Sequence, residues 1–208
     1  MQHVTGWPVI RFGAILLLVC LFGFIAFAAT SEVPPANIPW NASTSLTWDL
    51  FQAAAPADAA RRSEAAAIHM TIRWHAKYSV TSSGGLWTGH VQGVTATNTM
   101  EPSLSWVVAG KANDRVLHHE QAHFDLNEAY RRKLEALLPC LQAQSATKEG
   151  AIDALAAALH LRANEILGQL QAAQARYDTE TCHGDDPTSQ ARWEARIAAW
   201  LLHPTAAP

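Results

Sequence analysis

The sequence predicts an α+β fold in which a small antiparallel sheet is followed by three packed helices. Two patterns predict it. Residues 68–80 alternate between apolar and polar side chains, which is typical of a strand with one buried face. From residue 113 onward, apolar side chains recur at spacings of three and four, which is typical of helices with one buried stripe. The sheet therefore comes first along the chain and the helices second.

Residues 1–30 are expected to be a signal peptide or an N-terminal membrane anchor. Arg11 precedes an uncharged apolar run over residues 12–30, an order that sends the rest of the chain across the membrane. The small-x-small sequence at residues 26–28 favours cleavage, whereas a run close to the ~18 residues that span a bilayer keeps an uncleaved anchor open. Either alternative predicts a secreted or periplasmic domain, anchored to the inner membrane if the segment stays in place.

The rest of the chain is expected to form one domain. Residues 31–44 are rich in proline without a core pattern and predict an extended tether, and residues 204–208 predict a loose tail. Residues 45–203 between them suffice for a single domain. The 208-residue chain has a formal net charge of −3 and no Lys/Arg cluster, which argues against a nucleic-acid partner. The membrane is expected to be contacted only through the N-terminal segment, and the oligomeric state is left open.

Four strand-like segments precede the helices. Residues 45–51 suggest an initial strand or extended piece, and residues 68–80 give the clearest strand. A turn at residues 82–85 separates it from residues 86–99, which are typical of one or two strands. Residues 104–108 complete the sheet. Histidines at polar positions of these strands are assigned to a solvated face and not to a ligand set.

Three helices follow, each with a recognisable start. The first begins with Asn113 or Asp114 as N-cap and runs to about Leu138, before a proline. The second runs from about residue 147 to 177, and its apolar stripe predicts antiparallel packing on the first. In the third, Asp186 is the N-cap and Pro187 the first helical residue.

The first helix carries an HExxH motif, formed by His119, Glu120 and His123. Residues four apart lie on the same face of a helix, so both imidazoles can reach one tetrahedral ion while Glu120 reaches a water on it. The two histidines also lie within the helix's buried stripe, where imidazole nitrogens need partners. The motif predicts a zincin-like active-site helix that holds Zn²⁺.

The third ligand does not follow from the spacings used by common HExxH enzymes. The metzincin pattern would need glycine and histidine where Leu126 and Ala129 stand, and no acidic residue lies near positions 142–143. The richest source of ligands is residues 177–184, at the end of the second helix. Asp178, Glu180 and His183 all remain candidates on this evidence.

The chain resembles the bacterial domain-of-unknown-function family nine hundred and twenty-two, whose members are often described as secreted zinc-dependent proteases. The resemblance covers nearly the whole domain and rests on residues 45–51, Ser105-Trp106-Val107, the signature HEQxHFD from His119 to Asp125, Glu128 and Arg131 after it, the sequence Tyr-Asp-x-Glu-Thr-x-His-Gly over residues 177–184, and Gln190 and Trp193. The later Thr-x-His-Gly makes the match much more specific than HExxH alone.

The resemblance implies His183 as the third metal ligand beside His119 and His123, with Asp178 and Glu180 as alternatives. It also gives functional interpretations to neighbouring residues. A disulfide between Cys140 and Cys182 would fasten the ligand loop to the end of the first helix, although two free cysteines are the alternative. Further candidates are second-shell partners of the imidazoles, Asp125, Asp178 and Glu180, and oxyanion donors, Tyr177 and His118.

These features predict a secreted or membrane-tethered zinc metallopeptidase. Zinc-activated water would attack a peptide bond, with Glu120 as general base, and the substrate would be a peptide or protein of the cell envelope. Two alternatives remain. One is a non-enzymatic, metal-stabilised envelope binding module, and the other is a zinc amidase that acts on cell-wall peptide bonds. An open metal site favours an enzyme, whereas a site filled by four protein ligands favours a structural module.

Overall fold

The computed structural model describes residues 2–6, 37–43, 45–62 and 64–208. Its centre is a long antiparallel hairpin of β4 (Met70–Ser83) and β5 (Leu86–Met100). Gly84 and Gly85 form the turn, with φ of 59° and 82°, which glycine adopts without a Cβ clash. Between the pairs Lys77–Gly93 and Tyr78–Val91 the register shifts by one residue, which leaves Gln92 of β5 as the extra residue of a β-bulge. The residues predicted as one or two strands after the turn form one continuous strand.

Short strands extend both edges of this hairpin. β1 (Gln2–Gly6) pairs with β4, and both β2 (Ile38–Pro39) and β7 (Gln142–Ser145) pair with β5. All pairings are antiparallel. The predicted signal or anchor segment lies outside the described residues apart from β1. Within the described part of the chain, no helix combines the length and hydropathy that crossing a membrane requires.

The three predicted helices are present with the predicted caps. α1 spans Asp114–Leu137, α2 spans Lys148–Thr181 and α3 spans Pro187–Leu202. The side chains of Asn113, Thr147 and Asp186 accept backbone N–H groups in the first turns, which satisfies donors that have no partner within the helix. The described residues also contain five short 3-10 helices: η1 (Trp48–Leu50), η2 (Ala59–Arg62), η3 (Pro102–Leu104), η4 (Leu138–Cys140) and η5 (Pro204–Ala206).

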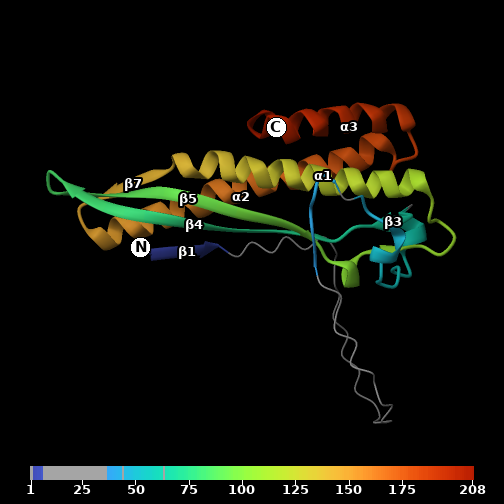
Figure 1. Ribbon diagram of the computed structural model, residues 1–208, viewed down its shortest axis with the longest axis horizontal. Helices are drawn as coiled ribbons and strands as arrows, with labels where there is room; N and C mark the ends of the chain where they lie inside the picture. Colours follow the sequence, from blue (N-terminus) through green and yellow to red (C-terminus); the bar gives the residue numbers. More distant parts are fainter. Residues whose placement is uncertain (1, 7–36, 44, 63) are drawn as a thin grey trace, which may run out of the picture.

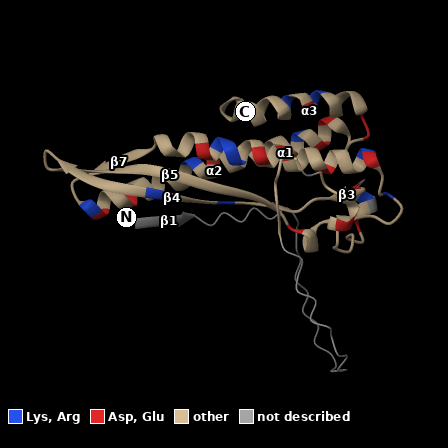
Figure 2. Cartoon of the chain, in the orientation of Figure 1, with Lys and Arg blue, Asp and Glu red and all other residues tan. Residues whose placement is uncertain are grey.

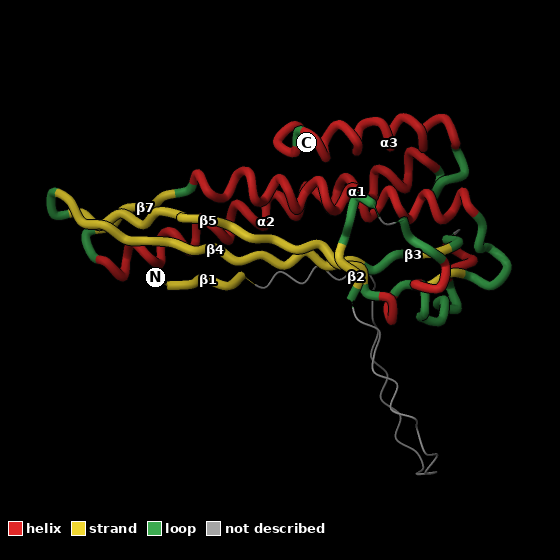
Figure 3. Tube along the Cα trace, viewed as in Figure 1, coloured by secondary structure: helices red, strands yellow, loops and turns green. Residues whose placement is uncertain are grey.

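The fold is α+β and layered. α1 and α2 cover one face of the hairpin, and α3 packs on the far side of the helical layer (Figure 1). The hairpin and the helices lie side by side along the length of the molecule (Figure 3). The main core lies between them, where alternate side chains of β4 meet the apolar stripes of α1 and α2. Its largest fully buried side chains include Tyr130, Leu134, Leu159, Ile166, Tyr177 and Trp193. Acidic and basic residues are interspersed along the helices (Figure 2).

A second, smaller core lies on the other side of α1 and corrects the predicted domain start. It contains Leu46, Phe51, Ile68, Met70, Met100 and Phe124. Trp40 takes part in this region: its backbone N–H donates to Asn98 O at 2.9 Å and its indole to Asp125 Oδ1 at 2.7 Å. Ile38 and Trp40 pack against this core, so at these two positions the predicted tether is attached to the domain.

Of the strand or extended piece predicted for residues 45–51, no strand is present. Thr47 has an extended backbone, and the 3-10 helix η1 follows it. Residues 104–108 contribute only β6 (Trp106–Val107), which pairs with β3 (Ala66–Ala67) in a separate two-stranded sheet.

The predicted loose tail is packed. Ala207 is 3% exposed, and the buried Lys133 Nζ donates to the backbone oxygens of Ala207 and Pro208 at 2.7 and 2.9 Å. The hydroxyl of Tyr130 donates to Pro208 O at 2.9 Å. A buried lysine needs such acceptors, and residues 204–208 supply them, which explains why this segment is held on α1.

Candidate metal centre

The helix α1 brings the two histidines of the HExxH motif together. His119 and His123 are one turn apart, and their Nε2 atoms lie 3.1 Å from each other. The side chain of His119 is 4% exposed and that of His123 is 11% exposed. The two rings therefore meet in a buried position, as the helical stripe predicted.

Asp178 of α2 faces both imidazoles. Its Oδ1 atom lies 3.1 Å from His119 Nε2 and 2.8 Å from His123 Nε2. The prediction of Asp178 as a second-shell partner of a non-metallated nitrogen does not fit this position, because the carboxylate meets the nitrogens that point into the centre. Asp178 instead occupies the place of a candidate ligand.

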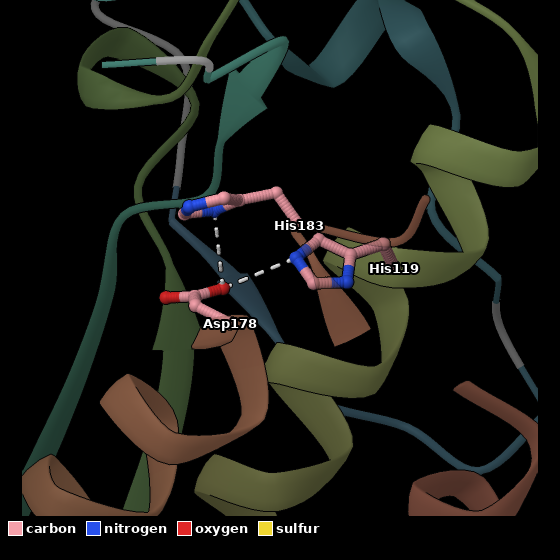
Figure 4. Close-up of side chains that lie close together, drawn as sticks. All are labelled: His119, Asp178 and His183. Atoms are coloured by element: carbon pink, nitrogen blue, oxygen red, sulfur yellow. Dashed lines mark hydrogen bonds and ion pairs between the residues drawn. The ribbon is translucent and has the colours of Figure 1, made fainter. Parts of the chain in front are cut away.

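His183 reaches the same carboxylate from the turn after α2. Its Nδ1 atom lies 3.8 Å from Asp178 Oδ1, and one ligand atom each from His119, Asp178 and His183 fit within 4.8 Å of one another (Figure 4). Cys182, His183 and Gly184 have φ of 50°, 53° and 83°. A Cβ on Gly184 would lie 3.0 Å from His119 Cβ, so only glycine lets the turn pass this close to the ligand helix.

Two glutamines determine which imidazole nitrogens carry protons. Gln174 Nε2 donates to the backbone oxygen of His123 at 3.1 Å, so its Oε1 faces His123 Nδ1 at 2.5 Å. Gln190 Nε2 donates to the Glu194 carboxylate at 2.9 Å, so its Oε1 faces His119 Nδ1 at 3.2 Å. Because both amide oxygens can only accept, each Nδ1 must be the donor. Both Nε2 atoms are then left to face Asp178.

This arrangement fits a bound cation. In the neutral histidines, two Nε2 lone pairs and a carboxylate oxygen converge on one another, and all three are acceptors. Their separations of 2.8, 3.1 and 3.1 Å are close to the ~3.3 Å between ligands of a tetrahedral zinc ion. His119, His123 and Asp178 thus form a candidate metal site, and the donor set suits a divalent metal such as zinc.

In the absence of a metal, a proton is the other cation that the cluster can hold. Burial alone would lower the pKa of His123, but the charge and hydrogen bond of Asp178 outweigh it and raise the pKa to about 9. Burial disfavours ionisation of Asp178, yet His123 and hydrogen bonds from both imidazoles hold its pKa well below the usual range. One proton serves one pair of atoms, whereas a metal ion serves all three acceptors.

Glu120 points away from the main core, toward the second one. It is 3% exposed, lies one turn from both Leu117 and Phe124, and accepts the backbone N–H of Ile68 at 2.9 Å. Burial raises the pKa of Glu120, and the nearby positive charges of the two histidines oppose that shift only in part. The carboxylate is therefore close enough to the cluster to interact with it and is more basic than an exposed glutamate.

Three other predicted site residues serve the structure around the cluster. Tyr177 is fully buried, stacks on the His119 ring with centroids 4.6 Å apart, and donates to Gln190 Oε1 at 2.8 Å, so its hydroxyl does not face a substrate. Asp125 accepts hydrogen bonds from Trp40 and Gln121 and contacts neither imidazole. Glu180 accepts from the Trp193 indole at 2.8 Å and pairs with Arg176.

Of the two alternatives for the cysteines, a disulfide or two free thiols, the structure shows the second, because Cys140 and Cys182 are free and exposed. Cys140 follows the C-terminal end of α1, whereas Cys182 precedes the turn that packs on His119, near the start of α1. The stretch from His119 to Leu137 alone is about 27 Å of helix. A disulfide requires Cα atoms within about 7 Å, so the two thiols cannot pair within one chain.

The sequence gave no role to the two glutamines that orient the histidines. Gln190 belonged to the matching residues of the family resemblance, but its function was not apparent. Gln174 lies one turn before Asp178 on α2, so the spacing i, i+4 placed it on the same helix face. That spacing was the signal in the sequence that Gln174 and Asp178 act at the same site. The packing of α2 on α1 then shows that both side chains face the histidines.

Neither the curated proteins nor the solved structures gave a match to this chain. The family comparison did: residues 43–184 match the family described as a bacterial protein of unknown function (DUF922). The match begins near the second core and ends with the Gly184 turn, so it contains the HExxH helix, Asp178 and His183. The chain therefore belongs to the DUF922 family.

Proposed function

We propose that this protein is a zinc-dependent hydrolase that cleaves amide bonds in peptides, with His119, His123 and Asp178 as metal ligands. The convergence of two Nε2 lone pairs on the Asp178 carboxylate carries the proposal, because the glutamines leave these nitrogens without protons of their own. Zinc, when bound, supplies a Lewis acid that polarises a carbonyl group and eases deprotonation of water at neutral pH.

Glu120 is the proposed general base. A base works best when its pKa lies near the working pH, and burial raises the pKa of Glu120 in that direction. The hydrogen bond from Ile68 N–H fixes one carboxylate oxygen and leaves the other to take a proton from water. The proton would then pass to the leaving amine, so the same residue acts first as a base and later as an acid.

The proposed substrate and location rest on the sequence. A HExxH helix with a basic glutamate supports hydrolysis of an amide bond in a protein or in a cell-wall peptide. The apolar segment within residues 1–30 supports a secreted or periplasmic site of action, where such substrates occur. The cell-wall amide is therefore a second substrate of the same proposed chemistry.

A non-enzymatic, metal-stabilised module is the rival function. The observation that favours it is His183, whose Nδ1 lies 3.8 Å from Asp178 Oδ1 and which forms a group of possible ligands with His119 and Asp178, so that a movement of its imidazole toward the cluster would add a fourth protein ligand. A metal held by four side chains has no position for water and contributes stability alone.

The test compares metal content and peptide hydrolysis for the wild type, His119→Ala and Glu120→Gln. We expect one zinc per chain in the wild type and in Glu120→Gln, none in His119→Ala, and hydrolysis of a quenched fluorescent peptide library by the wild type alone. His75→Ala, on the exposed side of β4, is the matched control and should behave as the wild type. Zinc binding without hydrolysis of library or cell-wall peptides supports the rival module, and a wild type without zinc contradicts both functions.

A further inference from the structure

We propose that His183 is a displaceable fourth ligand of the metal. In the resting state it would close the site, and it would move off the metal when a substrate binds. This inference rests on the proposed function and deepens it. His119, His123 and Asp178 would hold the metal permanently, whereas His183 would alternate between the metal and solvent. The site would then be both a closed, four-ligand centre and an open, three-ligand centre, depending on the position of one imidazole.

Burial separates His183 from the other three candidate ligands. The side chains of His119 and His123 are 4% and 11% exposed and that of Asp178 is 32% exposed, whereas that of His183 is 40% exposed. His183 also lies farthest from the shared oxygen, at 3.8 Å, with the other two nitrogens at 3.1 and 2.8 Å. Of the four side chains, it has the most room to move away.

Support from neighbouring side chains shows the same contrast. A glutamine oxygen holds the Nδ1 atom of each buried histidine, and Asp178 is held between the two Nε2 atoms. The only interaction of the His183 side chain with another side chain that the structure shows within its described residues is the ion pair to Asp178. Ligands oriented by such partners stay in place, so the unsupported one is the natural point of exchange.

The backbone at His183 is fixed, so the movement would be a rotation of the side chain. His183 N–H donates to Asp178 O at 2.9 Å, and Asp186 N–H donates to Thr181 O at 2.8 Å. Gly184 is clamped against the His119 ring. Cys182 and His183 are held in the left-handed region, which side chains other than glycine adopt rarely and mainly where the surroundings enforce it. The turn thus presents one imidazole to the cluster from the solvent side without moving itself.

The experiment replaces the metal with Co²⁺, whose visible absorption reports the number and type of its ligands. The wild type, His183→Ala, His183→Asn and Asp178→Ala would be titrated with Co²⁺, with His75→Ala as control. Asparagine tolerates the left-handed backbone, so His183→Asn separates loss of the imidazole from damage to the turn. Circular dichroism would confirm that each variant folds.

We expect His183→Ala and His183→Asn to bind one Co²⁺ with a changed visible spectrum, and Asp178→Ala to lose the metal. Azide and acetohydroxamate, which need an open position, should then perturb the spectrum of both His183 variants at lower concentration than that of the wild type. If the closed state is about ten times as populated as the open one, the difference is about tenfold.

Three results would overturn the inference, and they are distinguishable. Unchanged spectra in the His183 variants mean that His183 is not a ligand. Loss of Co²⁺ from the His183 variants but not from Asp178→Ala makes His183 the permanent third ligand. A wild type that binds no Co²⁺ or Zn²⁺ removes the proposed function, and the ligand exchange with it.

Discussion

At the scale of single residues, the centre is defined by the acceptors behind the histidines as much as by the histidines themselves. Gln174 and Gln190 each use the amide nitrogen on a group that can only accept, which turns the amide oxygen toward an imidazole. The consequence is a pair of Nε2 lone pairs directed at one carboxylate. Neutral amides, unlike carboxylates, orient the rings without adding negative charge behind them.

Gln174→Leu and Gln190→Leu should therefore weaken metal binding without removing a ligand. We expect each to raise the dissociation constant for zinc by about 10- to 100-fold, because the ring loses its orienting partner. Competition with a chromophoric chelator measures the effect, and Gln92→Leu, exposed on β5, is the control. Wild-type affinity in Gln174→Leu would contradict the role given to this residue.

The proton on His123 makes metal binding depend on pH. Its pKa is raised from 6.5 to about 9 in the metal-free fold, so zinc must displace this proton below pH 9. Zinc affinity should rise by about tenfold per pH unit from pH 6 to pH 8, measured in chelator-buffered titrations. An affinity that stays constant over this range would mean that His123 is already deprotonated.

The raised pKa of His123 also determines how the stability of the metal-free fold changes with pH. A raised pKa means that the folded state binds the proton more tightly than the unfolded state. The contribution of His123 is therefore complete below about pH 6.5 and lost as the pH rises through about 9. The zinc-dependent gain in stability should accordingly be larger at pH 8 than at pH 6.

At the scale of elements, α1 is the part of the fold that the sequence predicted best. Its cap at Asn113, its extent and its buried face all follow from local pattern and spacing, and the structure agrees. The short segments were predicted poorly, because a strand forms only where it pairs with another: residues 104–108 contribute only β6, and residues 45–51 contain no strand. The sequence also could not decide between Asp178 and His183 as the third ligand. Which of the two side chains lies closer to the histidines depends on how the end of α2 and the following turn pack against α1.

The turn after α2 is the element on which the centre depends, and Gly184→Ala tests it. Gly184 has φ of +83° and an added Cβ would lie 3.0 Å from His119 Cβ. We expect the free energy of unfolding to fall by about 1–3 kcal/mol and zinc binding to weaken, because the turn must withdraw from the ring. Urea unfolding measures the first effect. Gly93→Ala, with no atom within 4 Å of its Cβ position, is the control and should change zinc binding little.

At the scale of the whole molecule, residues 37–43 and 45–51 belong to the domain and contact α1 on the side that faces the second core. Leu46 N–H donates to Gln121 Oε1 at 2.8 Å, and Trp40 donates to Asp125. Gln121 and Asp125 are the remaining polar residues of the HEQxHFD signature. They join residues 37–51 to the helix whose other faces carry the candidate ligands and Glu120, so one helix links the second core to the centre.

Asp125→Leu and Trp40→Phe test whether the hydrogen bond between these residues stabilises the fold without changing the affinity for zinc. Each removes the hydrogen bond of 2.7 Å between the indole and the carboxylate. We expect each to lower the free energy of unfolding by about 1–2 kcal/mol, because a partly buried group loses a hydrogen bond to a charged partner. The double variant should lose less than the sum, since both changes break the same bond. Zinc affinity should stay at the wild-type value in all three. If Asp125→Leu instead weakened zinc binding while Trp40→Phe did not, Asp125 would have to act on the histidines and not only on the contact with Trp40.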